Sequence, residues 1–308
     1  IKMDILYKLP FPKEVCSKIF FLACKSPHSD LSIGVLKNII GLRNYNKLLK
    51  NGGIVMDGDG NVVKIKNNSL CWEDAKKITF DLVRLESLSK LTEIDLSDTG
   101  ITGDIADLKS LPNLTDVQFV RTSITGDIAD LKSLPNLKEI CLDITEVTGD
   151  IINLKSMQNL TSVCLSDTLV SGNIVHLESM TNLTNIYLGA TQVVGDITHI
   201  KSLTNLTSIY LGDADIVGNI VHLRNLPNLT EIQLCNSDVI GDIVHLNRLE
   251  NLTVISLGGP EITGDITEMK SLPNLNLIEL FSTGVYVDEK AFHEYRKTAG
   301  ISKCDLNM

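Results

Sequence analysis

The chain has 308 residues, of which 43% are hydrophobic and 21% charged, and its formal net charge at pH 7 is −10. An acidic chain lacks the basic face on which nucleic-acid-binding modules depend, so we expect no nucleic acid among its partners. No stretch approaches the roughly 18 apolar residues that span a membrane, so we expect no membrane span.

Two segments precede the regular part of the chain. Residues 1–50 are predicted to be helical and to form an N-terminal cap. Residues 51–81 are predicted to contain a hairpin, because the apolar runs 54–56 and 62–65 flank a turn rich in glycine and aspartate. Within the first segment, residues 9–20 are similar to the start of an F-box, although the only tryptophan, Trp72, does not supply the later part of that motif. This resemblance implies an alternative function, that of a substrate adaptor in a ubiquitin ligase.

Residues 82–285 form a repeat array. The same phrase returns every 23 residues: a glycine, then aspartate or asparagine, then regularly spaced apolar residues. A fixed period of this length indicates a solenoid, in which one unit stacks on copies of itself and no unit can bury its apolar residues alone. The repeated glycines are Gly103, Gly126, Gly149, Gly172, Gly195, Gly218, Gly241 and Gly264.

The repeat over residues 183–206 shows how each coil is expected to fold. Residues 183–188 alternate apolar and polar, which predicts a short strand. Residues 190–195 are predicted to form a turn that buries Val193. Asp196 is a predicted N-cap, and the apolar residues after it lie three apart, the spacing of a 3₁₀ segment. Because helical segments need more room than strands, the stack is predicted to curve with its strands on the concave side.

The units follow the pattern Leu-x-x-Ile-x-Leu-x-x-Thr-x-(Ile/Val)-x-Gly-x-Ile, with Ala214, Ser237 and Pro260 as breaks at the threonine position. This spacing resembles that of leucine-rich-repeat proteins of the plant type. The resemblance implies an α/β fold, a right-handed solenoid with a parallel concave β-sheet and short 3₁₀ or helical convex segments. The unit is one residue shorter than is usual, and threonine stands where the family has a ladder of asparagines; its hydroxyl can still bond to backbone groups. For function, the resemblance implies only a binding scaffold.

Residues 286–308 are predicted to form a helical C-terminal cap. The repeat register would place a glycine at position 287, where the chain has Val287, so the regular array stops there. An open apolar end requires a cover. Residues 288–300 supply one, since Asp288 is a helix start signal and Gly300 a stop signal.

The outward strand residues form columns on the predicted concave face, and the core does not need them. The first three repeats are acidic here and are expected to attract a basic segment. The central repeats place Tyr187 and Tyr210 on adjacent strands, with Gly189 and Gly212 leaving space beside each ring. Alternatively, the two rings stack on each other and simply cover the sheet. The candidate partner-binding residues are Glu93, Asp95, Asp116, Gln118, Glu139, Asp143, Asn185, Tyr187, Tyr210 and Gln233.

Three further sets of polar residues recur at fixed repeat positions. Cys141 and Cys164 are predicted neighbours, near enough for a disulfide. An odd number of cysteines, seven in all, and no signal peptide favour reduced thiols and a cytoplasmic protein. Asn-Leu-Thr recurs as a formal glycosylation sequon, but the repeat explains it without glycans. The convex side carries a histidine ladder of undetermined role, whose straight column does not supply tetrahedral metal geometry: His176, His199, His222 and His245.

The leading hypothesis is a noncatalytic scaffold that binds a protein or peptide, of basic character where it meets the acidic repeats. We find no nucleophile–base pair, phosphate-binding loop or zinc signature, so no catalytic residue, metal ligand or cofactor is predicted. The alternatives are the F-box adaptor and a purely structural or surface-binding repeat protein, in which substitution of the two tyrosines has no effect. The sequence does not determine the partner or the oligomeric state.

Overall fold

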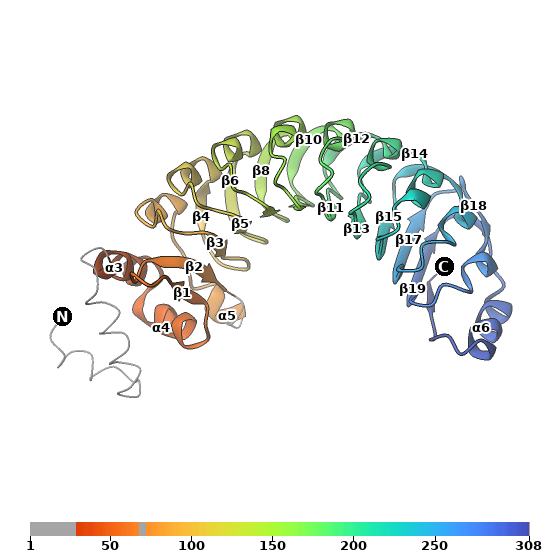
Figure 1. The fold of residues 1–308 in the computed structure, drawn as a ribbon, viewed down its shortest axis with the longest axis horizontal. Helices are drawn as coiled ribbons and strands as arrows, with labels where there is room; N and C mark the ends of the chain where they lie inside the picture. The colour runs from red at the N-terminus through yellow and green to blue at the C-terminus, as the bar shows by residue number, and fades with distance from the viewer. Residues whose placement is uncertain (1–28, 68–71, 308) are drawn as a thin grey trace.

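A computed structural model describes residues 29–67 and 72–307. These residues form an arched, open solenoid with strands along its inner side and short helical segments along its outer rim (Figure 1). The residues behind the F-box hypothesis, 9–20, lie outside the described part. In the part that is described, no helix is both long and apolar enough to cross a bilayer.

The inner side of the arch is a sheet of twelve strands. It begins with an antiparallel hairpin and continues as parallel strands, each paired with the strand one repeat later. Its strands, in sheet order, are β1 (Ile54–Met56), β2 (Val62–Lys66), β3 (Glu93–Asp95), β5 (Asp116–Gln118), β7 (Glu139–Cys141), β9 (Ser162–Cys164), β11 (Asn185–Tyr187), β13 (Ser208–Tyr210), β15 (Glu231–Leu234), β17 (Val254–Gly258), β19 (Leu277–Phe281) and β21 (Asp305–Asn307).

The structure contains a second parallel sheet, of nine strands, which the sequence does not predict. The turn expected at residues 190–195 is replaced by strand β12, because its copies in the neighbouring coils pair with it. A short segment with a central glycine is a weak strand signal in isolation. The strands are β4 (Thr102–Asp104), β6 (Ser123–Asp127), β8 (Glu146–Asp150), β10 (Leu169–Asn173), β12 (Gln192–Asp196), β14 (Asp215–Asn219), β16 (Asp238–Asp242), β18 (Ile262–Asp265) and β20 (Gly284–Tyr286).

The outer rim consists of 3₁₀ segments, each capped by the aspartate or asparagine before it. In the coil of Asp196, the carboxylate Oδ1 accepts a hydrogen bond from the Thr198 N–H at 2.7 Å, as the N-cap prediction requires. The segments are η1 (Leu82–Leu85), η2 (Ile105–Ser110), η3 (Ile128–Ser133), η4 (Ile151–Ser156), η5 (Ile174–Leu177), η6 (Ile197–Ile200), η7 (Ile220–Asn225), η8 (Ile243–Leu246) and η9 (Ile266–Met269).

The 23-residue glycine period has two physical causes. Gly195 has φ +124°, a backbone conformation that side chains disfavour. A Cβ on Gly195 would also lie 2.5 Å from Oδ1 of Asn173, the cap residue of the preceding coil. Glycine and cap residue therefore depend on each other across every interface between coils.

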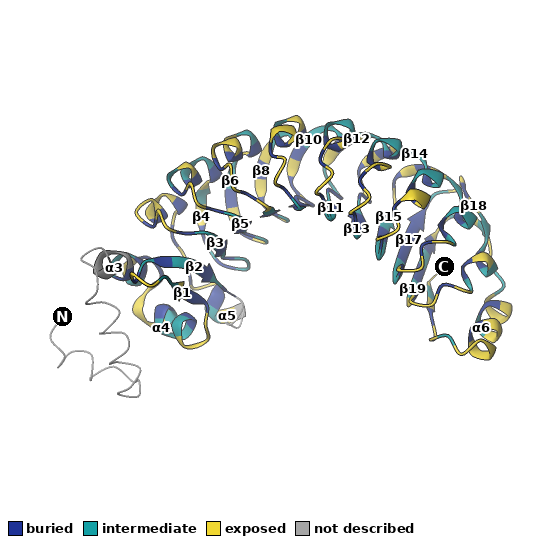
Figure 2. Cartoon of the chain, in the orientation of Figure 1, coloured by how far each residue is buried: buried dark blue, intermediate teal, exposed yellow. Residues whose placement is uncertain are grey.

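The core is a continuous stack made mainly of leucine, isoleucine and valine side chains. Figure 2 shows buried positions recurring in every coil along the arch. Beside it runs the threonine ladder, in which each hydroxyl donates to the carbonyl three residues earlier. In the coil of Thr145 the acceptor is Leu142 O, at 2.6 Å. The threonines thus satisfy buried carbonyls inside their own coil, as the sequence predicted.

Both ends of the stack are covered. Helices α3 (Ser29–Ile40) and α4 (Leu42–Lys50) pack beside the β1–β2 hairpin, with the short helix α5 (Trp72–Ala75) after it. At the other end, helix α6 (Glu289–Thr298) is N-capped by Asp288, whose carboxylate accepts a hydrogen bond from the Ala291 N–H. Arg296 of α6 is only 1% exposed. Its guanidinium donates at 2.8 Å to the carbonyls of Leu272, Leu275 and Ser302.

Candidate binding site on the concave face

The concave sheet places all ten candidate residues in or directly beside its strands. The pairing register joins Glu93, Asp116 and Glu139 in one column. A second column joins Cys141, Cys164, Tyr187, Tyr210 and Gln233, each side by side with the next. Asp143 lies two residues beyond the end of strand β7. The columns expected from the repeat register are therefore correct.

The acidic zone is smaller than the sequence predicts. Strand β2 adds to the sheet next to β3, which brings Lys64 and Lys66 beside Glu93. Both lysines form salt bridges with Glu93, the Lys66 Nζ–Oε2 distance being 2.6 Å. Burial alone would raise the pKa of Glu93, but the hydrogen bonds from these lysines hold it below its usual value. The sequence does not reveal this contact, because the hairpin that carries both lysines is assigned to a cap. The available signal was their spacing of two residues, which places both side chains on one face of a strand.

Asp116 and Glu139, in contrast, form a like-charge pair. They occupy matching positions on the adjacent strands β5 and β7, and both are half-buried. Burial, followed by the charge of Asp116, raises the pKa of Glu139. Within residues 29–67 and 72–307, neither carboxylate takes part in a salt bridge. Two like charges side by side on a sheet are destabilising, so this pair favours the approach of a cation.

The two tyrosines lie side by side at the centre of the sheet, both half-buried. The space beside the glycines is filled by one of the rings. A Cβ on Gly189 would lie 2.7 Å from Cζ of Tyr210, and a Cβ on Gly212 would lie 3.3 Å from its Cε2. Burial raises the pKa of the Tyr187 hydroxyl, and the neighbouring Ser208 offsets part of that rise. The glycines therefore seat the Tyr210 ring and leave no empty slot for a ligand.

Cys141, Asp143 and Cys164 lie together next to the tyrosines. Their sulfur and carboxylate oxygen atoms are all within 4.8 Å of one another. Both cysteines are free thiols, and their mutual hydrogen bond lowers the pKa of Cys164 and raises that of Cys141. Burial raises the pKa of Asp143 to about 6. The sequence predicted that the cysteines are neighbours but not that a carboxylate joins them.

No protein-family model matches the sequence, and no curated protein matches it significantly. Solved structures do match. The ectodomain of the Arabidopsis receptor kinase HAESA, described as a leucine-rich-repeat ectodomain in complex with an extended IDA peptide hormone, has a TM-score of 0.68 at 18% identity and covers 84% of this chain. The chain has the leucine-rich-repeat fold.

Two further leucine-rich-repeat structures match. One is HAESA in complex with IDA and the co-receptor SERK1. The other is the plant peptide hormone receptor RGFR1 in complex with RGF2. The first has a TM-score of 0.64 at 18% identity and covers 82% of this chain and 50% of that one. The second has a TM-score of 0.57 at 25% identity and covers 66% of this chain and 34% of that one. HAESA in the IDA complex is likewise covered over 50% of its length. This chain thus spans between a third and a half of the length of these structures.

The histidine ladder lies on the outer rim of the leucine-rich-repeat solenoid. His176, His199, His222 and His245 occupy segments η5 to η8 and are half-buried. His199 Nδ1 lies 3.1 Å from Oε2 of Glu178. Across the described ranges, these histidines do not come together in any group that could hold a metal ion.

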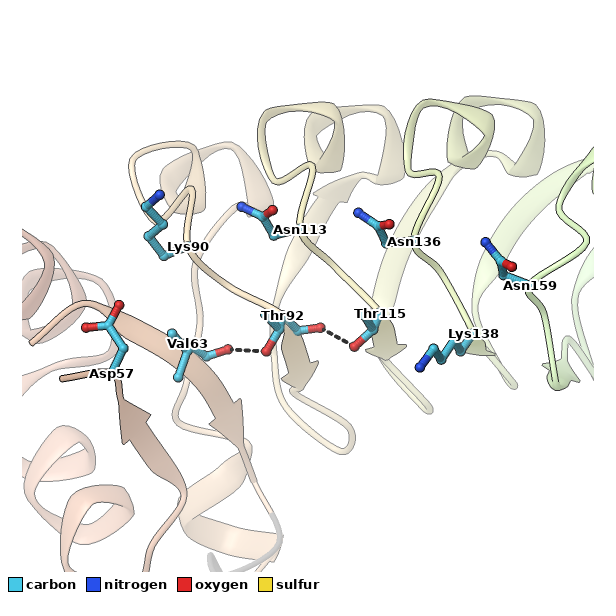
Figure 3. Close-up of a pocket in the computed structure, with 9 residues that line it drawn as sticks. All are labelled: Asp57, Val63, Lys90, Thr92, Asn113, Thr115, Asn136, Lys138 and Asn159. Carbon is cyan, nitrogen blue, oxygen red and sulfur yellow. Dashed lines mark hydrogen bonds between the residues drawn. The ribbon is translucent and has the colours of Figure 1, made fainter. Parts of the chain in front are cut away.

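A shallow groove of about 590 Å³ runs along one flank of the leucine-rich repeats, between the rim and the concave sheet (Figure 3). Of its asparagines and threonines, Asn113, Thr115 and Asn159 belong to the recurrent Asn-Leu-Thr triplets, while Thr92 and Asn136 hold the same repeat positions in Lys-Leu-Thr and Asn-Leu-Lys. The Asn113 amide donates to Ser89 O at 2.8 Å, and the Thr115 hydroxyl donates to Thr92 O at 3.0 Å. These groups join neighbouring coils, which explains the repeated sequon by structure alone.

Proposed function

We propose that this chain is a noncatalytic leucine-rich-repeat scaffold that binds a polypeptide on its concave face. The HAESA and RGFR1 structures, which share the fold, are described as complexes with peptide hormones. The concave positions vary from coil to coil, while the core and cap positions repeat. Variation on a regular frame is how solenoids adapt one surface to one partner.

The observation that carries this proposal is the like-charge pair of Asp116 and Glu139. Each carboxylate is half-buried, and their proximity raises the pKa of Glu139 in addition to burial. A lysine or arginine side chain from a partner would relieve both the repulsion and the cost of desolvation. The partner is therefore expected to present a basic residue to strands β5 and β7.

The distance to the tyrosines sets the size of the bound segment. Strands β5 and β13 are four steps apart in the sheet, or about 19 Å at ~4.8 Å per step. An extended chain covers that distance in about six residues at ~3.3 Å each. The expected ligand is thus a segment with a basic residue at one end and an apolar or aromatic residue about six positions away, packed on Tyr187 and Tyr210.

The test is selection of displayed random peptides on the wild-type chain. Enriched peptides should be basic and should lose affinity for the double variant D116N/E139Q, which keeps the side-chain shapes. The matched control is D107N/D130N, which removes two carboxylates from the outer rim of the same two repeats.

Loss of binding in D116N/E139Q with retention in the control supports the proposal. Equal binding by both variants, or failure to enrich any peptide, contradicts it. The variant Y187A/Y210A separates the two halves of the proposed site: if it binds like the wild type, the tyrosines only cover the sheet.

A further inference from the structure

Three potential metal ligands converge on the concave face. Cys141 and Cys164 occupy the same position in consecutive coils, so strands β7 and β9 hold them side by side. Asp143 lies two residues after Cys141 and projects from the same face of the extended chain. The two sulfurs and a carboxylate oxygen lie within 4.8 Å of one another, and no other such group occurs among residues 29–67 and 72–307.

The spacing of these atoms suits zinc. Zinc binds thiolate sulfur at ~2.3 Å and carboxylate oxygen at ~2.0–2.2 Å. In a tetrahedron, these bond lengths put neighbouring ligand atoms roughly 3.5–3.8 Å apart. The three donor atoms, all within 4.8 Å of one another, exceed that separation by at most about 1.3 Å. Thiolates select zinc over calcium and magnesium, which prefer sites made of oxygen.

The surroundings already orient two of the three groups. One oxygen of Asp143, Oδ1, accepts a hydrogen bond from the Ser166 N–H at 2.6 Å. The Ser162 hydroxyl lies 3.4 Å from the sulfur of Cys164. Outer contacts of this kind fix the orientation of ligands in metal sites.

We propose that Cys141, Asp143 and Cys164 form a zinc site with three protein ligands and a fourth position open to the concave face. Cys164 is 4% exposed, while Cys141 and Asp143 are half-buried, so the base of the site is closed and its mouth faces the surface on which the ligand of the proposed function would lie. Water or a donor atom from a bound partner completes the tetrahedron. Two thiolates and one carboxylate carry three negative charges, of which zinc neutralises two.

The test uses the full chain, reduced and then freed of metal and reductant under inert gas. Zinc binding is measured by competition with a chromophoric chelator, and cobalt is used as a spectroscopic substitute. The wild type should bind one equivalent of zinc that C141S and C164S each lose, and its thiolate-to-cobalt charge-transfer band should disappear in both. D143N should weaken binding by at least about tenfold, because loss of a direct ligand costs no less than loss of an outer contact.

The control is C235S. Cys235 is another free thiol on the concave face, where it hydrogen bonds with Ser256, and its removal should leave zinc binding and the cobalt band unchanged. Circular dichroism checks that each variant is folded, and D143N tests the site even if a cysteine variant is not. Zinc bound by other cysteines will still bind to C141S and C164S, so only the difference between the wild type and these variants measures the proposed site.

Two results overturn the proposal. One is a wild type that binds no more zinc than C141S, C164S and D143N do. The other is a cobalt spectrum without a thiolate band. A reduced protein that forms a Cys141–Cys164 disulfide on exposure to air but binds no zinc beforehand gives the first of these results and would identify the pair as a redox couple.

Discussion

Replacing Arg296 by methionine is expected to destabilise the C-terminal end of the solenoid by about 4–5 kcal/mol. The guanidinium donates three hydrogen bonds of 2.8 Å to backbone carbonyls, and each hydrogen bond to a charged group contributes ~1.5–3 kcal/mol. The low end of that range applies, because the buried cation forms no salt bridge with any described carboxylate, so its desolvation is only partly offset. Methionine keeps most of the volume, which limits any cavity.

Equilibrium urea unfolding followed by circular dichroism measures this change, and hydrogen exchange shows where it acts. Amides of residues 262–307 should exchange faster in R296M, while those of the central coils should not change, since each coil contacts only its neighbours. The matched control is K297M, the next residue on the same helix, which is exposed and should stay within about 0.5 kcal/mol of the wild type. A loss below about 1 kcal/mol in R296M would refute the claim that this side chain holds the cap.

Three further predictions concern the repeat itself and one of its surface ion pairs. Gly195→Ala should lower the free energy of unfolding by about 1–3 kcal/mol, because Gly195 has a positive φ and an added Cβ would contact Asn173. A loss no greater than that caused by Gly300→Ala, at an exposed glycine, would contradict this. Asp196→Ala should cost about 1 kcal/mol in urea unfolding through the lost cap, and Asp196→Asn should restore most of it. Arg121 hydrogen bonds hold the pKa of Asp98 below its usual value. The stabilisation from this ion pair is fully present above the pKa that Asp98 has in the unfolded chain. It is lost as the pH falls through the lower pKa of Asp98 in the folded protein. It should stay under about 1 kcal/mol because Arg121 is 54% exposed, and D98N should abolish this pH dependence.

The concave columns could be predicted from the sequence, but their electrostatics could not. A fixed period assigns each residue to a coil position, so the neighbours of Tyr187 and Cys141 followed from counting. The pairing of the N-terminal hairpin with the first repeat could not be predicted by counting, because the hairpin does not follow the 23-residue period. The salt bridges from Lys64 and Lys66 to Glu93 exist only because the hairpin joins the sheet in register.

The sequence by itself determined the repeat, its caps and the residues that face the concave side, because these depend on local spacing and on identical neighbours. Only the tertiary structure decided how those residues interact. It turned the predicted turns into a second sheet, since stacked copies supply the missing hydrogen bonds. It filled the space at Gly189 and Gly212 with the Tyr210 ring and brought Asp143 to the two thiols. Side-chain direction depends on packing between coils, and the period does not encode that.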